Sequence, residues 1–318
     1  MLDSSSNPCP LCGASSAATL SQVHLSDVWQ AYAEQWATAF SDDVIAKYGD
    51  GPVALRRCGR CELDWFDPAL EGDSGFYSQL FTGGIAYETW RWEFDQAAQR
   101  IVDGARVVEV GSGEGAFLRS VLRRCSSVEA LEKNPDAADL LRAAGIKVSE
   151  DDVRADALVR PARADVVCAF QVLEHVADVR GFLSALATIV VPGGEILLSV
   201  PNRERLFRQD LEPNDCPPHH LSRWSPRQFT AVAEVLGMDL VLVECQPPSL
   251  YYTRAARQRP VRMALRPVTG AWMAQLAGRA TARVRMPERR HARLVAEGRF
   301  ASRGEYGHTM FAVLRRRG

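Results

Sequence analysis

The chain has 318 residues, of which 47% are hydrophobic and 24% are charged. This composition is typical of a globular protein and excludes a disordered or fibrous chain, while the length suggests about two structural units. No apolar run approaches the roughly 18 residues that a membrane-spanning helix requires, and residues 1–6 lack the basic and apolar regions of a signal peptide. We therefore expect a soluble, cytoplasmic protein.

The formal charge of −1 conceals an uneven distribution of charge along the chain. Residues 251–318 contain 16 arginines and three acidic residues, about +13. Removing these from the totals of 38 basic and 39 acidic residues leaves 22 basic and 36 acidic residues before position 251, about −14. Such a basic segment can contact phosphate, nucleic acid, an anionic membrane surface or the acidic remainder of its own chain.

Two Cys-x-x-Cys pairs occur near the start of the chain, Cys9 with Cys12 and Cys58 with Cys61. In a reducing compartment such pairs indicate a metal site, and their spacing lets both sulfurs of a pair face one ion. Four thiolates bind Zn²⁺ tetrahedrally and leave no open position, so we predict a structural zinc in a domain of residues 1–70. The four remaining cysteines are isolated, and we expect them to be packing residues.

The 45 residues between the two cysteine pairs exceed the usual zinc-ribbon spacing. Aromatic residues at positions 29, 32, 36 and 40 recur at helical spacing, which predicts an inserted helix with its aromatic side chains in a core. A polar stretch at residues 71–75 is the expected linker. The aromatic-rich segment that follows predicts a helix ending near Val102.

Strand and helix patterns alternate from residue 106 onward. Short apolar strands are expected at residues 106–110, 128–131, 165–170, 195–200 and 239–243. Between them we expect helices, including one capped by Asn134, one beginning near Asp178 and one capped by Ser225, with a turn at residues 192–194. This order predicts an α/β, Rossmann-like doubly wound domain over residues 71–250.

A glycine-rich turn follows the first of these strands, with the sequence Glu109-Val-Gly-Ser-Gly-Glu-Gly115. Glycines at such a turn let the backbone approach a ligand closely. A dinucleotide site would carry its third glycine one residue later, and Glu114 would repel a pyrophosphate, so a cationic, phosphate-free ligand fits better. Glu132 ends the next strand and is placed to accept hydrogen bonds from ribose hydroxyls.

Four segments together resemble class I S-adenosylmethionine-dependent methyltransferases: residues 109–115, the acid Glu132, residues 170–176 (FQVLEHV) and residues 191–202 (VPGGEILLSVPN). The resemblance covers about residues 100–245. It also implies a closing antiparallel strand, for which residues 307–314 are the candidate. The four-cysteine unit resembles that of bacterial methyltransferases from sugar and natural-product clusters, including sugar C-methyltransferases.

The resemblance implies an S-adenosylmethionine site formed by Glu109, Gly111, Ser112, Gly113, Gly115, Glu132, Asp152 and Gln171. The glycine turn would hold the methionine part of the cofactor, and Glu109 would anchor its ammonium group directly or through water. Glu132 would bind the ribose, and Gln171 would begin the loop beside the donor methyl. Asp152 lies in an acidic run near the expected adenine pocket, where the register stays open.

Three histidines are candidates for a general base. His175 follows the strand at residues 165–170, whereas His219 and His220 lie in a proline-stiffened tract at the carboxyl edge of the predicted sheet. A near-neutral imidazole suits proton removal from a hydroxyl or an acidic carbon. We favour His220, then His219, then His175; the alternative is that these side chains only brace their loops.

Three functions follow from these features. The first is methyl transfer to a small-molecule, sugar, glycan or secondary-metabolite acceptor. The second is RNA methylation by the zinc unit and the arginine-rich tail, but the chain lacks the Asn/Asp-Pro-Pro-aromatic signature and its tail has few aromatics for base stacking, so a nucleic-acid partner is disfavoured. The third, a non-catalytic binding scaffold, is disfavoured by the intact glycines and ribose acid.

The segment of residues 251–318 is expected to form a helical insert and then the last strand of the sheet. Apolar residues at 268, 272, 273 and 276 have helical spacing, which predicts that the insert covers the acceptor or lies on a membrane surface. The sequence leaves the acceptor, the methylated atom and the oligomeric state open.

Overall fold

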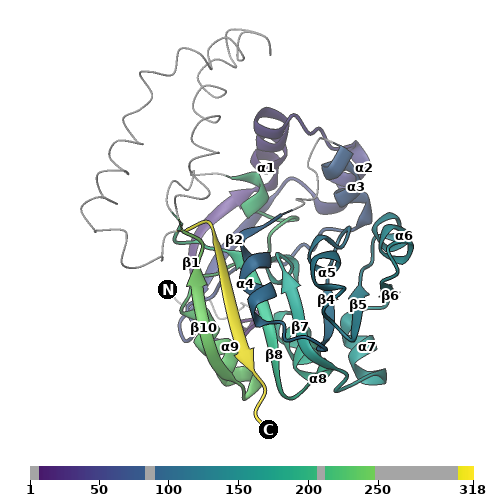
Figure 1. Cartoon of the computed structure of the whole chain (residues 1–318). Coiled ribbons are helices and arrows are strands. Elements are labelled where there is room, and N and C mark those ends of the chain that lie inside the picture. Colours follow the sequence, from purple (N-terminus) through teal and green to yellow (C-terminus); the bar gives the residue numbers. More distant parts are fainter. Residues whose placement is uncertain (1–6, 83–89, 206–211, 248–306) are drawn as a thin grey trace, which may run out of the picture.

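The structure is a computed structural model that describes residues 7–82, 90–205, 212–247 and 307–318 (Figure 1). The helical insert expected within residues 251–306, with most of the arginines of the tail, lies outside the described residues. Among the described residues, no helix combines the length and the hydropathy that crossing a bilayer requires.

A seven-stranded sheet forms the centre of the molecule, with the strand order β10-β11-β8-β7-β4-β5-β6. Its strands are β4 (Arg106–Val110), β5 (Ser127–Leu131), β6 (Lys147–Ser149), β7 (Ala164–Phe170), β8 (Val190–Pro201), β10 (Asp239–Cys245) and β11 (Thr309–Arg315). The strands from β6 to β8 are parallel, and β11 pairs antiparallel with both β8 and β10. The expected closing strand is thereby confirmed.

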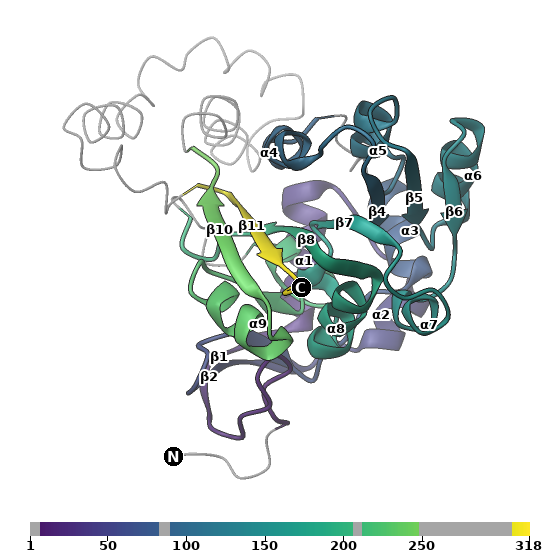
Figure 2. The ribbon, with the colours of Figure 1, turned by 60° about the horizontal axis from the view of Figure 1, so that its bottom comes forward.

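Helices cover both faces of this sheet. They are α4 (Trp92–Arg100), α5 (Ala116–Val121), α6 (Pro135–Ala143), α7 (Val153–Val159), α8 (Val179–Ile189) and α9 (Gln228–Leu236). Figure 2 shows α4, α5 and α6 along one face and α7, α8 and α9 along the other. The predicted Rossmann-like, doubly wound α/β fold is therefore confirmed.

The helix starts agree with the sequence at two positions and differ at a third. Asn134 caps α6 by accepting a hydrogen bond from Asp136 N at 3.0 Å, and Asp178 caps α8 through Gly181 N at 2.9 Å. Ser225 does not cap α9, because its backbone N–H and hydroxyl both bond Gln228 Oε1; the helix begins at Gln228 with Arg227 as its N-cap.

Residues 192–194, where a turn into the strand at 195–200 is expected, fall within the range of β8, which begins at Val190, but they interrupt its regular pairing. Gly193 has a left-handed φ of 79°, and the β7–β8 register passes from Ala164–Val190 to Val166–Glu195. Gly193 N donates to Arg316 O and Arg316 N donates to Gly194 O, both at 2.9 Å. The chain end thus supplies hydrogen-bond partners for this irregular stretch, and no local pattern in residues 192–194 reveals them.

A second, four-stranded sheet has the order β1-β2-β3-β9. Its strands are β1 (Ala17–His24), β2 (Pro52–Cys58), β3 (Asp64–Asp67) and β9 (Ser222–Arg223). Because β9 follows the central strands in sequence, this sheet joins the cysteine-containing unit to the Rossmann-like body. One hydrophobic cluster spans both, with Leu11 and Leu63 in the same core as Phe182 and Trp224. The boundary at residue 70 stays a prediction.

The insert between the cysteine pairs differs from the single helix that the aromatic spacing predicts. It contains β1, the helix α1 (Leu25–Ala31), a π-helical turn η1 (Tyr32–Trp36), the helix α2 (Asp42–Tyr48) and β2. The left-handed Ala37 (φ 55°) follows η1 and ends the helical run. The aromatic side chains do form a core, in which Phe40 stacks on Phe76 of α3 (Ser74–Thr82) with ring centroids 5.0 Å apart.

Candidate active site

The glycine turn joins β4 to α5, and its first and last glycines, Gly111 and Gly115, have no room for a side chain. Gly111, Gly113 and Gly115 all adopt positive φ angles of 70°, 52° and 79°. A Cβ atom on Gly111 would lie 2.6 Å from Val172 Cγ2, and one on Gly115 would lie 2.3 Å from Leu141 Cδ2. Glycine is therefore required here both by backbone conformation and by packing.

Two buried oxygen atoms beside this turn have no hydrogen-bond partner among the described residues, Oε2 of Glu109 and Oγ of Ser112. Glu109 precedes the last residue of β4 and is only 2% exposed, and burial raises the pKa of its carboxyl group well above the ordinary value. A buried polar atom without a partner is costly, so both oxygens suit a ligand that brings positive charge or hydrogen-bond donors.

Glu132 lies directly against the glycine turn. Its Oε2 accepts a hydrogen bond from Gly113 N at 2.7 Å, and its Oε1 accepts one from Asn134 N at 2.9 Å. The two backbone donors fix the direction of the carboxylate, and each oxygen retains a lone pair. The structure thus brings the predicted ribose acid and the predicted methionine-binding turn together.

Asp152 lies after β6, at the start of α7, where its side chain is already engaged. It accepts from Arg154 N at 2.9 Å as the N-cap of the helix and forms ion pairs with Lys133 and Arg154. The hydrogen bond from Arg154 holds the pKa of Asp152 far below its usual range. These contacts give Asp152 a capping role that the sequence did not predict.

Gln171 follows β7 in a left-handed conformation, with a φ of 56°. Its Nε2 lies 3.2 Å from both Ser199 Oγ and Glu93 Oε1. Glu93 is a buried acid of α4 that sequence reasoning missed. An acid between two large aromatics, Trp92 and Phe94, on an otherwise amphipathic helix is the signal that was available for it.

The three candidate histidines form one cluster, although they come from two loops. His175 lies in the short 3₁₀ helix η2 (Leu173–His175), and its ring centroid is 4.8 Å from those of both His219 and His220. The side-chain ligand atoms of the three residues lie within 4.8 Å of one another, near enough for a shared metal ion. Burial lowers the pKa of His175 to about 3, that of His219 well below its ordinary value and that of His220 as well.

Hydrogen bonds define the protonation of His175. Its Nδ1 lies 2.7 Å from the carbonyl oxygen of His219 and 3.0 Å from the hydroxyl of Tyr77. Because a carbonyl oxygen only accepts, Nδ1 carries the proton, and Nε2 of the neutral ring keeps a lone pair. Tyr77 belongs to α3, so the aromatic core beside the zinc unit reaches the histidine cluster.

Glu174 and Asp215 flank the histidines, and the sequence analysis singled out neither. Glu174 Oε1 lies 3.8 Å from His175 Nε2 and 4.0 Å from His220 Nε2, and neither carboxylate oxygen has a hydrogen-bond partner among the described residues. Burial raises the pKa of Glu174 to about 8. Asp215 Oδ1 lies 3.4 Å from His220 Nδ1. The cluster therefore combines three imidazoles with two buried carboxyl groups, Glu174 and Asp215.

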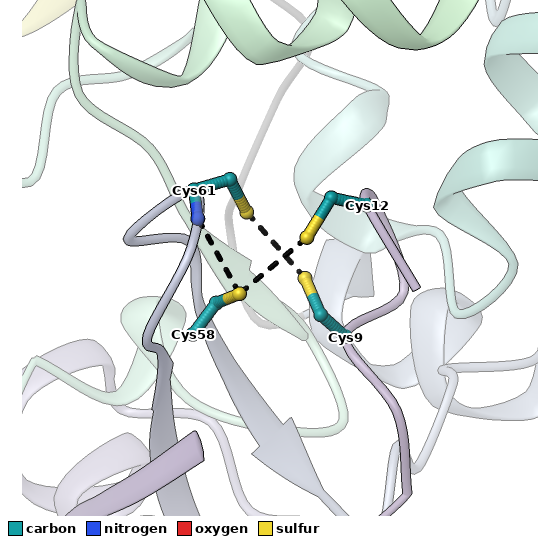
Figure 3. Close-up of side chains that lie close together, drawn as sticks. All are labelled: Cys9, Cys12, Cys58 and Cys61. Atoms are coloured by element: carbon teal, nitrogen blue, oxygen red, sulfur yellow. Dashed lines mark hydrogen bonds between the residues drawn. The ribbon is translucent and has the colours of Figure 1, made fainter. Parts of the chain in front are cut away.

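The four predicted zinc ligands converge, although two of them precede the insert and two follow it (Figure 3). The Sγ atoms of Cys9 and Cys61 are 3.5 Å apart, as are those of Cys12 and Cys58. The backbone N–H groups of Arg60 and Cys61 point at Cys58 Sγ, at 3.3 and 3.4 Å. Tetrahedral Zn–S bonds of about 2.3 Å bring sulfurs to roughly this separation, so the four residues fit one zinc ion.

Comparisons with known proteins bear on this site. Two similar curated proteins are ubiquinone biosynthesis O-methyltransferases. That of Cupriavidus pinatubonensis is 35% identical over 106 residues, 31% of this chain and 43% of that protein. That of Leptothrix cholodnii is 33% identical over 159 residues, 48% of this chain and 64% of that protein. The chain spans about half the length of the curated relatives it matches.

Similar solved structures include a SAM-dependent methyltransferase from Archaeoglobus fulgidus, 15% identical, with 76% of this chain and 100% of that chain covered and a TM-score of 0.48. The family described as "Methyltransferase domain" matches residues 84–243, half of the 318-residue chain. This match begins ahead of α4, contains the glycine turn, Glu132 and the histidine cluster, and ends in β10. The chain therefore belongs to the methyltransferase-domain family.

Proposed function

We propose that the chain transfers the methyl group of S-adenosylmethionine to a small-molecule acceptor. The observation that carries this proposal is the pair of buried oxygens without partners, Glu109 Oε2 and Ser112 Oγ, beside the glycine turn of the matched segment. S-adenosylmethionine brings an ammonium group and no phosphate, and a buried carboxylate needs such a cationic partner. A dinucleotide would instead bring a negative pyrophosphate close to Glu109.

The remaining cofactor residues follow from their positions around the turn. Glu132, oriented by Gly113 N and Asn134 N, accepts hydrogen bonds from ribose hydroxyls through its free lone pairs. Gln171 lies at the end of β7, on the acceptor side. Asp152 has the least support as an adenine neighbour, because both of its oxygens already pair with Lys133 and Arg154.

When bound, S-adenosylmethionine supplies an electrophilic methyl group on a sulfonium. The chain's own residues then need to align the acceptor and remove its proton. His220 is our preferred base, with His219 and His175 as alternatives. The lowered pKa values keep all three rings neutral near neutral pH, so each offers a nitrogen lone pair. The curated relatives are O-methyltransferases, which favours an acceptor hydroxyl on a sugar, glycan or secondary metabolite.

The four-cysteine cluster is proposed to hold one structural Zn²⁺. Three of the four cysteines are buried, and four thiolates complete a tetrahedral shell with no position for substrate. The ion would cross-link the chain before β1 to the end of β2 and the turn that follows it. Its effect on activity is therefore expected to be indirect, through the stability of the fold.

Titration calorimetry with S-adenosylmethionine and its demethylated product tests the cofactor assignment. Incubation with isotope-labelled donor and a panel of hydroxylated acceptors, followed by mass spectrometry, tests the transfer. Failure to bind either ligand would contradict the proposal, and binding of a nicotinamide dinucleotide instead would reverse it. Methylation of RNA, and of none of the small molecules, would make RNA the acceptor in place of a small molecule. Binding without transfer to any acceptor would favour a non-catalytic scaffold.

A further inference from the structure

A buried acid, Asp215, lies beside the preferred base. It ends the short 3₁₀ helix η3 (Pro213–Asp215), and it is 4% exposed. Its Oδ1 lies 3.4 Å from Nδ1 of His220, which is 6% exposed. The two side chains are five residues apart and face each other across a loop that contains two consecutive prolines.

Contacts at both ends of Asp215 hold it in this position. Its other carboxylate oxygen, Oδ2, accepts from Nη2 of Arg205, which is itself buried. Its backbone carbonyl accepts from Nε and Nη2 of Arg223 in β9, at 3.2 and 3.0 Å. Oδ1 is thus the oxygen left to face the imidazole.

The loop also fixes the position of the histidine backbone. His220 N donates to Cys216 O at 3.1 Å, and Leu221 N donates to Glu174 O at 2.7 Å. The ring therefore has little freedom to move away from Asp215. Since an ionised carboxylate only accepts, Asp215 favours the tautomer of His220 with its proton on Nδ1 and its lone pair on Nε2.

The charged and titratable groups around the His220 ring are Asp215, Glu174, His175, His219, Arg205 and Arg223. They come from η2, η3 and β9, from the turn after β8 and from the loop between η3 and β9. Burial is the largest effect and lowers the pKa of His220, whereas Asp215 raises it. Asp215 is the one that faces the Nδ1 edge of the ring, and Glu174 lies 4.0 Å from Nε2 on the other edge.

We propose that Asp215 is the positioning residue of the proton acceptor: it holds His220 in the tautomer whose Nε2 takes the acceptor's proton, while Arg205 and Arg223 fix Asp215. Asp215 itself touches neither donor nor acceptor in this role. The inference rests on the proposed function, because it assigns a partner to the proposed base. It goes beyond that function by naming the group that sets the base's protonation.

The test compares Asp215→Asn with the matched control Glu212→Gln. Both acids pair with Nη2 of Arg205, but Asp215 is the one that also faces His220. An asparagine amide can donate to Nδ1 and so favours the wrong tautomer. We expect Asp215→Asn to lower kcat by about a hundredfold to ten-thousandfold, with donor affinity and acceptor KM near wild type, while Glu212→Gln keeps most of the activity.

A second measurement does not depend on activity. Nitrogen-15 NMR of histidine-labelled full-length protein distinguishes protonated from unprotonated ring nitrogens, and His220→Ala identifies the His220 signals. We expect Nδ1–H in the wild type and loss of that state in Asp215→Asn. A purely structural role of Asp215 would lower stability without changing the tautomer. Should Asp215→Asn fail to fold, the wild-type spectrum alone still decides the tautomer.

Three results would overturn the proposal, two of them without touching the base assignment. One is an Nε2–H tautomer of His220 in the wild type. Another is full activity of Asp215→Asn when His220→Ala is inactive, which leaves the base and the methyltransferase function intact. If His220→Ala is itself fully active while donor binding and transfer persist, the base assignment and the positioning role fall together and the proposed function stands.

Discussion

At Gly113 the backbone has a φ of 52° and the amide donates to Glu132. We predict that Gly113→Val abolishes S-adenosylmethionine binding, because the added side chain fills the space that the cofactor needs against the turn. Titration calorimetry measures this. Gly145→Val is the control: it imposes a similar left-handed strain (φ 79°) with open space around the Cβ position, so it should keep the affinity. Unchanged affinity in Gly113→Val would remove the cofactor argument.

His220 carries the second prediction at this scale. His220→Ala should cut turnover by about a hundredfold to ten-thousandfold, because the acceptor's proton loses its base, while donor affinity stays near wild type. The limb of the pH–rate profile that belongs to His220 should lie below the ordinary imidazole value of about 6.5, since burial lowers the pKa of His220, and it should vanish in the variant. Activity lost in His175→Ala but kept in the His219 and His220 variants would move the base to η2.

Glu174 makes stability depend on pH. Burial raises its pKa to about 8 in the folded chain, so the folded state keeps a proton that the unfolded state releases above about pH 4.5. The contribution of this proton to the free energy of unfolding is fully present below that pH. It falls by about 4–5 kcal/mol as the pH rises toward 8. In urea unfolding, the free energy of unfolding of Glu174→Gln should therefore rise relative to that of the wild type as the pH rises from 5 to 8. The exposed Glu234→Gln is the control, and equal pH profiles for all three proteins would refute the shift.

At the scale of elements, the cysteine cluster brings the chain before β1 next to the end of β2. We predict one tightly held Zn²⁺ per chain and a lower unfolding temperature for Cys58→Ser. The four thiolates converge only in the folded chain, so the free energy of zinc binding stabilises the fold, and the variant loses part of it. Elemental analysis and thermal unfolding measure the two effects. Cys125→Ser, which changes a cysteine outside the cluster, should retain the zinc.

Metal content also separates two roles for the histidine cluster. A single equivalent, lost in Cys58→Ser, agrees with a structural zinc and free imidazoles. Protein purified without chelator that contains no zinc would contradict the cysteine site. A second equivalent, lost in His219→Ala, would assign an ion to the histidines and remove the general-base hypothesis.

At the scale of the whole molecule, the zinc unit and the body share a core. Gln228 Nε2 of α9 donates to Cys61 O at 3.0 Å, and β3 pairs with β9 next to the histidine loop. Loss of zinc should therefore disturb the structure of the acceptor side of the site through β9. Cofactor binding at the glycine turn, which follows β4 of the main sheet, should be affected less.

The charge of the tail gives the last prediction. Residues 251–318 carry about +13 against about −14 for the rest of the chain, so we expect the tail to pack on the acidic body, with weak RNA affinity. Fluorescence anisotropy with RNA at two salt concentrations measures this. Tight, strongly salt-dependent binding would instead support an RNA substrate, and co-sedimentation with anionic liposomes would support a lipid-linked acceptor.

The sequence by itself determined what depends on local pattern. The order of strands and helices, the cap at Asn134 and the helix start near Asp178 follow from periodicity and turn chemistry over a few residues. The closing strand was implied by the resemblance to class I methyltransferases. The glycine turn and Glu132 could be assigned to one site, because parallel strands end at one edge of a sheet. The four cysteines could be assigned to one metal site, because their spacing suits a single ion.

Only the tertiary structure decided what depends on residues far apart in the chain. Glu93, Glu174 and Asp215 acquire their importance from burial and from neighbours on other elements, and a single acid in a sequence carries no mark of either. The pairing of β9 with β3 and of Arg316 with β8 likewise needs partners that no local window contains. The lowered histidine pKa values follow from burial in one cluster, which forms only when two loops meet.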